Sequence, residues 1–273
     1  MEPASKPPKI SVVVPSFNQA AYLEETLRSV LDQDYPDLEL IVIDGGSSDG
    51  SVDIIRRYED RIAYWVSEPD GGQTRGLIKG FARASGDIEC WLNSDDLQEP
   101  TTLHEVAAYL AEHPETDAVY GDMLWVGGDG SPIREQREIP FNRYIWLHTY
   151  NYIPGMSMFW RRDLYEKAGG LDPAFDLAMD ADLWIRFADI GRIGHARRIW
   201  SRQRFYPDQK NRRLREQSDA EDARIRTRHL GAPRPIRFRL NRLAAFAIRI
   251  LWKLATGCYG PGYRRRMEAV ERP

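Results

Sequence analysis

Four short apolar runs stand in the first hundred residues, and each leads into a polar segment. The runs are 10–14, 38–43, 62–66 and 88–92. Continuous apolar runs of this length are typical of strands that are buried on both faces of a parallel sheet. Amphipathic segments stand between them, and strands that alternate with helices predict an α/β fold with a mostly parallel sheet flanked by helices.

Polar residues follow three of these runs directly. The segments are 16–18 (Ser-Phe-Asn), 44–46 (Asp-Gly-Gly) and 94–96 (Ser-Asp-Asp). In open α/β sheets, ligands bind in the crevice beyond the carboxyl ends of the strands. These three segments are therefore expected to meet at one ligand site.

Asp95 and Asp96 are adjacent acids at the end of the fourth run. Two carboxylates held a few ångströms apart repel each other, and one pKa rises unless a cation intervenes. Mg²⁺ or Mn²⁺, held by carboxylates together with diphosphate oxygens and water, relieves this repulsion. The alternative is a turn or helix cap before Pro100.

Asp44 ends the second run and stands before two glycines. Glycine lets a ligand approach the backbone closely. A carboxylate there can accept a hydrogen bond from a base or a ribose, or it can close an Asx-turn on its own backbone. No GxGxxG motif follows the first run, which argues against a dinucleotide-binding enzyme.

In order and spacing, these segments resemble family 2 glycosyltransferases of the GT-A fold, over roughly residues 9–205. The matching segments are 13–18, 40–50, 86–88, 91–96, 169–172 and 179–184. The resemblance implies a Rossmann-like sheet and inverting transfer of a sugar from a nucleotide-sugar donor, by family habit a UDP-sugar. The implied acceptor is a hydroxyl on a glycan or a lipid-linked molecule, in bacterial cell-surface polysaccharide or glycolipid synthesis.

The resemblance also assigns roles at the strand ends. Asp96 is expected to bind Mn²⁺ or Mg²⁺, Asp95 to bind the ribose or the metal, and Asp44 to read the base; Ser94 replaces the first acid of the family's DxD motif. The expected nucleotide- and donor-binding residues are Pro15, Ser16, Asn18, Asp44, Asp70, Gln73, Arg75, Lys79, Ser94 and Asp95. For Arg75 and Lys79 a solvated helix face is the alternative, although both side chains suit phosphate.

Asp180 matches the second acid of the family's Glu-Asp motif, which implies that it is the general base; Met179 replaces the first acid. The residues expected on the acceptor side are Gly155, Met156, Met179, Asp182 and Trp184. The aromatic residues Tyr144, Trp146, Tyr150 and Tyr152 can either stack on a sugar or pack in the core.

The domain prediction is a disordered segment 1–8, a GT-A domain 9–205 and a basic extension 206–273. Within the domain, 9–100 is the nucleotide half and 101–205 the acceptor half. Residues 1–185 carry 15 Lys/Arg against 33 Asp/Glu, whereas 186–273 carry 23 against 8. Such a split indicates an anionic partner for the basic part, unless the two parts pair with each other.

Residues 239–254 sort at helical spacing into an apolar stripe and a basic stripe. The apolar stripe has Leu240, Leu243, Ala244, Ala247, Leu251 and Leu254; the basic one has Arg239, Arg242, Arg249 and Lys253. This pattern predicts a helix on an anionic membrane surface, or else a helix docked on the catalytic domain. Residues 264–266 (Arg-Arg-Arg) add charge. No nucleic-acid-binding motif accompanies the charge, so no nucleic-acid partner is expected.

The expected location is cytoplasmic, peripheral on the inner face of the membrane. Cys90 and Cys258 lie far apart without CxxC spacing, as suits a reducing compartment. Two rival functions remain. A sugar-phosphate nucleotidyltransferase would need a Gly-rich basic loop after the first strand, which 16–19 lacks. A non-catalytic sugar-nucleotide binder would not need to keep Asp180 and Asp96.

Overall fold

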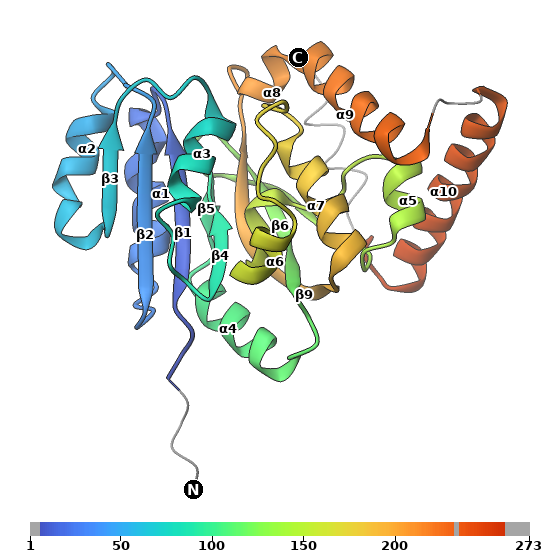
Figure 1. Ribbon diagram of the computed structural model, residues 1–273, viewed down its shortest axis with the longest axis horizontal. Helices are drawn as coiled ribbons and strands as arrows, with labels where there is room; N and C mark the ends of the chain where they lie inside the picture. The colour runs from blue at the N-terminus through green and yellow to red at the C-terminus, as the bar shows by residue number, and fades with distance from the viewer. Residues whose placement is uncertain (1–5, 232–234, 260–273) are drawn as a thin grey trace, which may run out of the picture.

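The computed structural model describes residues 6–231 and 235–259. Residues 1–5 of the predicted disordered N-terminus and the arginines at 264–266 lie outside this part. The strands form one sheet in the order β3-β2-β1-β4-β8-β6-β9-β5, with β7 paired to β6. Helices flank the sheet (Figure 1). The predicted α/β fold with a mostly parallel sheet is confirmed.

In the first half of the chain the four strands β1 to β4 run parallel, so their carboxyl ends share one edge of the sheet. The elements are β1 (Ile10–Ser16), α1 (Ala20–Leu31), β2 (Leu38–Asp44), α2 (Ser51–Arg57), the short 3₁₀ helix η1 (Glu59–Arg61), β3 (Tyr64–Ser67), α3 (Gln73–Phe81) and β4 (Ile88–Trp91). All four predicted strands are present, although the third begins two residues later than expected. The register sets Ser16 beside Asp44, and Asp44 beside Ser67.

Burial explains why these elements form. The residues of β1 are all buried, and β-branched valines suit a strand that is covered on both faces. Helix α1 buries Leu23, Leu27 and Val30 on one face. Helix α3 approaches β1 so closely that a Cβ on Gly80 would lie 2.3 Å from the side chain of Val13. A glycine is therefore required at this contact, and it lets α3 pack closely on β1.

The second half adds antiparallel strands. Its elements are β5 (Leu97–Gln98), α4 (Thr102–Glu112), β6 (Ala118–Gly127), β7 (Pro132–Gln136), α5 (Arg143–His148), η2 (Gly155–Ser157), β8 (Met158–Arg161), α6 (Arg162–Lys167), α7 (Met179–Ile190) and β9 (Ile193–Phe205). Strand β8 runs antiparallel to both β4 and β6. The predicted hairpin turn at 127–130 joins β6 to β7. The length of β9 was not foreseen.

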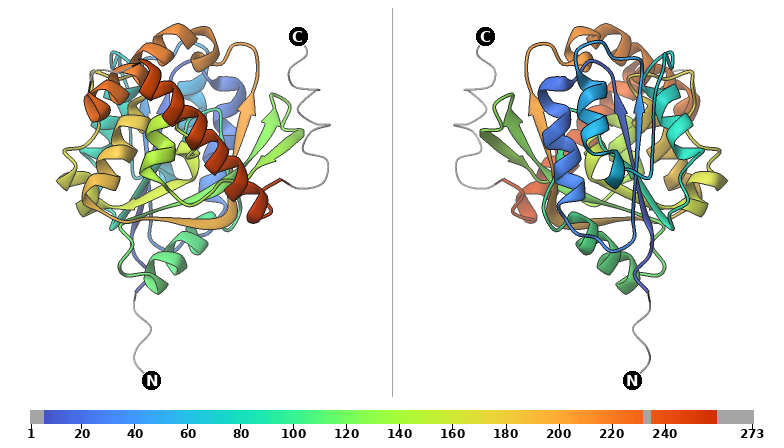
Figure 2. Two further views of the ribbon diagram at one scale, coloured as in Figure 1. Left: turned by 90° about the vertical axis from the view of Figure 1, so that its right-hand side faces the viewer. Right: turned by 90° about the vertical axis from the view of Figure 1, so that its left-hand side faces the viewer.

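In the described part of the chain after β9 there are three helices: α8 (Lys210–Arg213), α9 (Arg215–Leu230) and α10 (Pro235–Ala255). Helix α9 contacts α5, α7 and α8, and α10 contacts α5. Figure 2 shows α10 running diagonally across this face of the molecule, over α5. The predicted helix 239–254 is confirmed and is longer than expected. Within the described ranges, every helix is too short or too polar to cross a membrane.

Candidate active site

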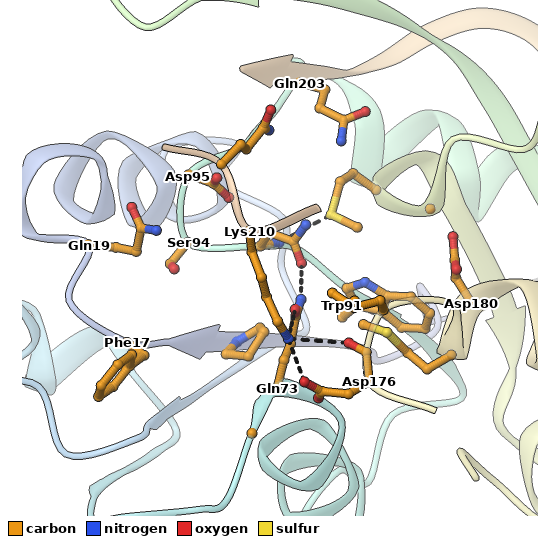
Figure 3. Close-up of a pocket in the computed structure, with 18 of the residues that line it drawn as sticks. Phe17, Gln19, Gln73, Trp91, Ser94, Asp95, Asp176, Asp180, Gln203 and Lys210 are labelled. Atoms are coloured by element: carbon orange, nitrogen blue, oxygen red, sulfur yellow. Dashed lines mark hydrogen bonds and ion pairs between the residues drawn. The ribbon is translucent and has the colours of Figure 1, made fainter. Parts of the chain in front are cut away.

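A cavity of about 750 Å³ opens beyond the carboxyl ends of β1 and β4. Its walls come from distant parts of the chain, including the start of α3, the segment before η2, the start of α7 and the segment around α8 (Figure 3). The predicted site residues that line it are Pro15, Ser16, Asp70, Gln73, Ser94, Asp95, Gly155, Met156, Met179 and Asp180. The structure therefore joins the strand-end residues and Asp180 in one pocket.

Asp180 lies in the first turn of α7, on the side of the pocket across from Phe17 and Ser94 (Figure 3). Its Oδ1 accepts a hydrogen bond from the backbone N–H of Ala181 at 2.8 Å. Burial raises the pKa of Asp180 from the ordinary value of 3.8 to about 6, and the hydrogen bonds that it accepts oppose this rise. The group is therefore ionised at neutral pH yet basic enough to accept a proton.

Asn151 fixes the other oxygen of this carboxylate. Its side-chain amide donates to Asp180 Oδ2 at 2.8 Å. Its own oxygen accepts from Trp146 Nε1 at 3.3 Å and from the backbone N–H of Ile153 at 3.1 Å. Because these two donors fix where the oxygen lies, the NH₂ group must face Asp180. Nothing in the sequence pattern singled out Asn151.

Asp95 lines the pocket at the end of β4. Its Oδ2 accepts from the Tyr206 hydroxyl at 2.7 Å. Burial raises the pKa of Asp95, while the hydrogen bond from Tyr206 opposes the shift. Arg204 holds the turn by donating to the backbone carbonyl of Asp95 at 2.7 Å. Asp95 thus presents its carboxylate to the pocket from a fixed backbone.

Asp96 points the other way, and we correct its assignment as a metal ligand. It is fully buried and does not line the pocket. Its Oδ1 accepts from the backbone N–H of Arg204 at 3.0 Å, and its Oδ2 accepts from Asn93 Nδ2 at 3.2 Å. Asp96 therefore ties β9 to the turn after β4, which the backbone N–H of Asp96 closes by donating to the carbonyl of Asn93 at 3.0 Å.

Asp44 is also fully buried and does not line the pocket. Its Oδ2 accepts from the N–H groups of Gly46 and Ser47 and from the Ser67 hydroxyl, and its Oδ1 accepts from the Ser47 hydroxyl at 2.6 Å. This geometry is the Asx-turn alternative. We therefore correct the prediction that Asp44 reads the base.

Three other predicted donor-binding residues do not line the pocket. Asn18 instead accepts a hydrogen bond from the backbone N–H of Ser48 at 2.9 Å, which joins the loops after β1 and β2. Arg75 is exposed, and Lys79 forms an ion pair with Glu68. The solvated helix face is therefore the interpretation that holds for Arg75 and Lys79.

Two predicted acceptor-side residues support the pocket from behind. Asp182 is buried and pairs with Arg186 at 2.7 Å and with Arg228 at 2.9 Å. Trp184 is buried and stacks on Trp91, with ring centroids 5.1 Å apart and planes 8° from parallel. Because Trp91 lines the pocket, Trp184 acts through it and does not face the acceptor.

The pocket wall beside β2 offers an aromatic ring and a carboxylate. Phe17 is 61% exposed and lines the pocket. Asp70 also lines it, and a Cβ added to Gly45 would lie 3.2 Å from Asp70 Oδ1. Gly45 therefore leaves the space that the carboxylate of Asp70 occupies. An aromatic face next to an acceptor oxygen suits a flat heterocycle with N–H donors.

Two cations of α8 also line the pocket, and the sequence pattern predicted neither. Lys210 Nζ donates to Asp176 Oδ2 at 2.7 Å and lies 3.4 Å from Gln73 Oε1 (Figure 3). Arg213 lines the same cavity. Both cations follow β9, whose length the sequence did not reveal. They bring positive charge to the pocket that Asp95 also lines.

Helix α9 braces the catalytic side of the pocket. Glu221 Oε2 accepts from the backbone N–H groups of Asp176, Leu177 and Ala178, at 3.0, 2.9 and 2.9 Å. These groups stand just before α7, so Glu221 fixes the approach to Asp180. Glu221 is buried, and the segment after 205 is in this way built into the site.

A divalent cation fits this pocket only with ligands that a substrate brings. Among the described residues, no three His, Cys, Asp or Glu side chains are grouped as they would be around a metal ion. Asp95 does offer one carboxylate on the wall. Mg²⁺ is often held by one or two carboxylates with phosphate oxygens and water. The oxygen chemistry of the wall therefore suits such an ion beside a bound diphosphate.

Comparison with known proteins places this geometry in a family. Residues 11–167 match the model of glycosyl transferase family 2. An uncharacterized glycosyltransferase of Mycobacterium tuberculosis is 36% identical over 186 residues, which are 66% of this chain and 69% of the relative. A PGL/p-HBAD biosynthesis glycosyltransferase of Mycobacterium bovis is 30% identical over 183 residues, with the same shares covered.

Two solved structures share the GT-A fold. S. aureus TarS in complex with UDP-GlcNAc has a TM-score of 0.61 and 21% identity, over 74% of this chain and 60% of TarS. The mannosyltransferase PcManGT from Pyrobaculum calidifontis, in complex with GDP-Man and Mn²⁺, has a TM-score of 0.62 and 21% identity, over 96% of this chain and 83% of PcManGT. At these identities the likeness establishes the fold.

Proposed function

This chain belongs to glycosyltransferase family 2, and we propose that it transfers one sugar, with inversion, from a UDP-sugar to an acceptor hydroxyl. The observation that carries the proposal is the carboxylate of Asp180, held across the pocket from the strand-end residues with a pKa of about 6. In a single displacement, base and leaving group lie on opposite faces of the anomeric carbon. A donor held between Asp180 and the strand ends meets that requirement.

The acceptor hydroxyl is a weak nucleophile until its proton is removed during attack. Asp180 takes this proton while the bond from the anomeric carbon to the diphosphate oxygen breaks. Asn151 and the backbone N–H of Ala181 hold the two carboxylate oxygens, so the base keeps one orientation throughout. Tyr150 lines the same side and is 43% exposed, so it offers aromatic surface to the acceptor sugar, whereas Tyr152 is packed in the core.

The nucleotide is proposed to lie at the carboxyl ends of β1 and β2. Phe17 supplies an exposed ring for the base, and Asp70 supplies an acceptor for a base N–H. Pro15 and Ser16 line the floor beneath it. A uracil ring is small and carries one imide N–H, which one carboxylate can accept. The complex of TarS with UDP-GlcNAc supports this choice of nucleotide.

The diphosphate is proposed to lie between Asp95 and α8. Asp95 would hold Mn²⁺ or Mg²⁺ together with the phosphate oxygens, and Lys210 and Arg213 line the same pocket. A bound divalent ion supplies Lewis-acid stabilisation of the charge on the departing diphosphate. Lys210 and Arg213 add electrostatic stabilisation of the same charge. The Mn²⁺ in the PcManGT complex supports a divalent ion here.

The acceptor is proposed to be a glycan or a lipid-linked molecule, used in bacterial cell-surface polysaccharide or glycolipid synthesis. The relative named for PGL/p-HBAD biosynthesis supports a role of this kind. The enzyme is proposed to work in the cytoplasm, peripherally on the inner face of the membrane. The excess of Lys/Arg after residue 185 supports an anionic surface as its partner.

A donor screen tests this function. Calorimetric titration with UDP, GDP and dTDP, each with and without Mn²⁺, is expected to give the tightest binding with UDP plus Mn²⁺. Slow hydrolysis of one UDP-sugar should accompany it. A protein that binds none of these nucleotides, or that binds UDP-sugars and never cleaves them, would contradict the proposal.

A further inference from the structure

Helix α10 docks on the enzyme through its charged face. The side chains of Arg249 and Lys253 are each 7% exposed, and that of Glu138, before α5, is 1% exposed. Arg249 reaches both oxygens of Glu138, at 2.9 and 2.7 Å, and Lys253 reaches one at 2.9 Å. An unpaired charge at this depth would be strongly destabilising. The pairing therefore fixes which face of α10 turns inward.

The docked face also carries apolar and aromatic contacts. Ala245 is fully buried, and Phe246 packs on Tyr150 with ring centroids 6.2 Å apart. Asn241 Nδ2 lies 3.3 Å from His148 Nε2. These contacts reach α5 and the loop after it. The contacts run from Asn241 to Lys253, and Figure 2 shows the helix lying diagonally over α5.

The opposite face of α10 is apolar and exposed. Its members follow the turns of the helix, which puts them on one side of it. They are Ile236, Leu240, Leu243, Ile250, Leu251 and Leu254, and each is at least 45% exposed. Contiguous exposed apolar surface of this kind marks an interaction site.

Charge indicates what covers this face. Arg237, Arg239 and Arg242 are exposed in the same helix, and α10 has no Asp or Glu. A second copy of α10 packed against the first would bring no acid to these arginines. An anionic lipid surface supplies both partners at once, acyl chains for the leucines and phosphates for the arginines.

We propose that the exposed face of α10 inserts into an anionic bilayer, with α10 held rigidly on the acceptor side of the pocket. Tyr150 connects the two, because it lines the pocket and packs on Phe246. Asn151, the partner of Asp180, is the next residue. The bilayer therefore lies beside the acceptor wall, and a lipid-linked acceptor reaches Asp180 without leaving the membrane. This last step rests on the proposed function.

The test is co-sedimentation of the full chain with vesicles of phosphatidylglycerol or of phosphatidylcholine. Leu243→Glu and Leu251→Glu change side chains that are 69% and 65% exposed, so both variants should fold. Each should weaken the partition onto phosphatidylglycerol vesicles at least about tenfold, because the variant loses a leucine side chain that the bilayer would bury. The matched control is Ile190→Glu, a 53% exposed residue at the end of α7, which should bind like the wild type.

Two further measurements separate the outcomes. The double variant Arg237→Gln, Arg239→Gln should bind less and lose part of its salt dependence. Donor hydrolysis by every variant should equal that of the wild type, because none of these residues lines the pocket. Wild-type protein that ignores phosphatidylglycerol vesicles at low salt overturns the inference and leaves the glycosyltransferase proposal intact.

A dimer in light scattering that Leu243→Glu dissociates, without any vesicle binding, also overturns the inference, because a second copy would then cover the face. If Leu243→Glu and Leu251→Glu weaken vesicle binding but the wild-type protein never cleaves a donor, the proposed function is contradicted. The inference that α10 binds the membrane then still holds.

Discussion

The side-chain amide of Asn151 donates a hydrogen bond of 2.8 Å to Asp180 Oδ2, and both residues line the same pocket. The bond joins the loop after α5 to the first turn of α7. Helix α9 holds both ends, since Arg226 donates to the backbone carbonyl of Trp146 at 3.0 Å and Glu221 caps the approach to α7. The base is therefore oriented by the part of the chain that follows β9.

Replacing Asp180 by Asn removes the proton acceptor and keeps the size of the side chain. We expect kcat to fall at least about 100-fold, the low end of general-base contributions. The affinity for UDP, measured by calorimetry, should barely change, because the strand-end residues across the pocket are untouched. Near-normal turnover in this variant would remove Asp180 from the mechanism.

Replacing Asn151 by Ala should move the acid limb of the pH–kcat profile to higher pH. The hydrogen bond from Asn151 favours the ionised carboxylate and lowers the pKa of Asp180, so its loss lets the pKa rise above about 6. We expect kcat at neutral pH to fall roughly tenfold, the size of one hydrogen bond to a charged group, with unchanged UDP affinity.

Glu89 gives the control for this profile. Burial raises its pKa to about 7, but it accepts from Trp160 Nε1 at 3.0 Å and does not line the pocket. Glu89→Gln should therefore leave the acid limb in place. If Glu89→Gln shifts the acid limb and Asn151→Ala does not, Asp180 does not set the pH dependence.

Asp180 also makes stability depend on pH. Its folded pKa of about 6 is higher than its ordinary value of 3.8, so the folded state holds the proton more tightly and stability falls as pH rises from about 4 through 6. At pH 8 the ionised group costs on the order of 1–3 kcal/mol. Asp180→Asn should therefore raise the free energy of unfolding at pH 8, by denaturant titration, and change it little at pH 4. Equal effects at both pH values would contradict this.

The two acids after β4 should separate cleanly. Asp95→Asn should reduce UDP affinity in Mn²⁺ to the value without Mn²⁺, while thermal unfolding changes little. Asp96→Ala leaves the N–H of Arg204 and the amide of Asn93 without their acceptor, which costs about 1–3 kcal/mol of stability. While folded, it should still bind UDP with Mn²⁺. If Asp96→Ala instead loses the effect of Mn²⁺ on UDP affinity and Asp95→Asn keeps it, Asp96 is the metal ligand.

Lys210→Met should weaken UDP binding without metal roughly tenfold, since charge-assisted hydrogen bonds to phosphate are lost. Lys79→Met is the matched control, because Lys79 pairs with Glu68 and does not line the pocket. If both variants lose affinity equally, the effect is one of net charge and α8 has no direct role.

The fold was predictable because continuous apolar runs between helices allow few sheets. The edge of that sheet was predictable for the same reason, and it brought Ser16, Ser94 and Asp95 together. The identity of the exposed carboxylate was not. Two of the acids predicted at strand ends, Asp44 and Asp96, are buried, and nearby donors occupy their carboxylate oxygens. Such local bonding depends on loop geometry that residue order alone does not contain.

Other site residues depend on contacts between distant segments. Lys210 reaches Gln73 across 137 positions of sequence, and Tyr206 reaches Asp95 across 111. The orientation of α10 depends on a single buried acid, Glu138. It turns Arg249 and Lys253 inward, whereas the sequence pattern placed them with the outward basic stripe. The docked interpretation therefore describes the charged face of α10, and the membrane interpretation describes its exposed apolar face.

The most direct test of inverting transfer through Asp180 needs no known acceptor. The hydrolysis of an α-linked UDP-sugar by the enzyme can be followed by proton NMR before the released sugar mutarotates. Water attacking from the side of Asp180 should release the β-anomer first, and Asp180→Asn should release almost none. Release of the α-anomer first, or an undiminished rate in the Asn variant, would contradict the account.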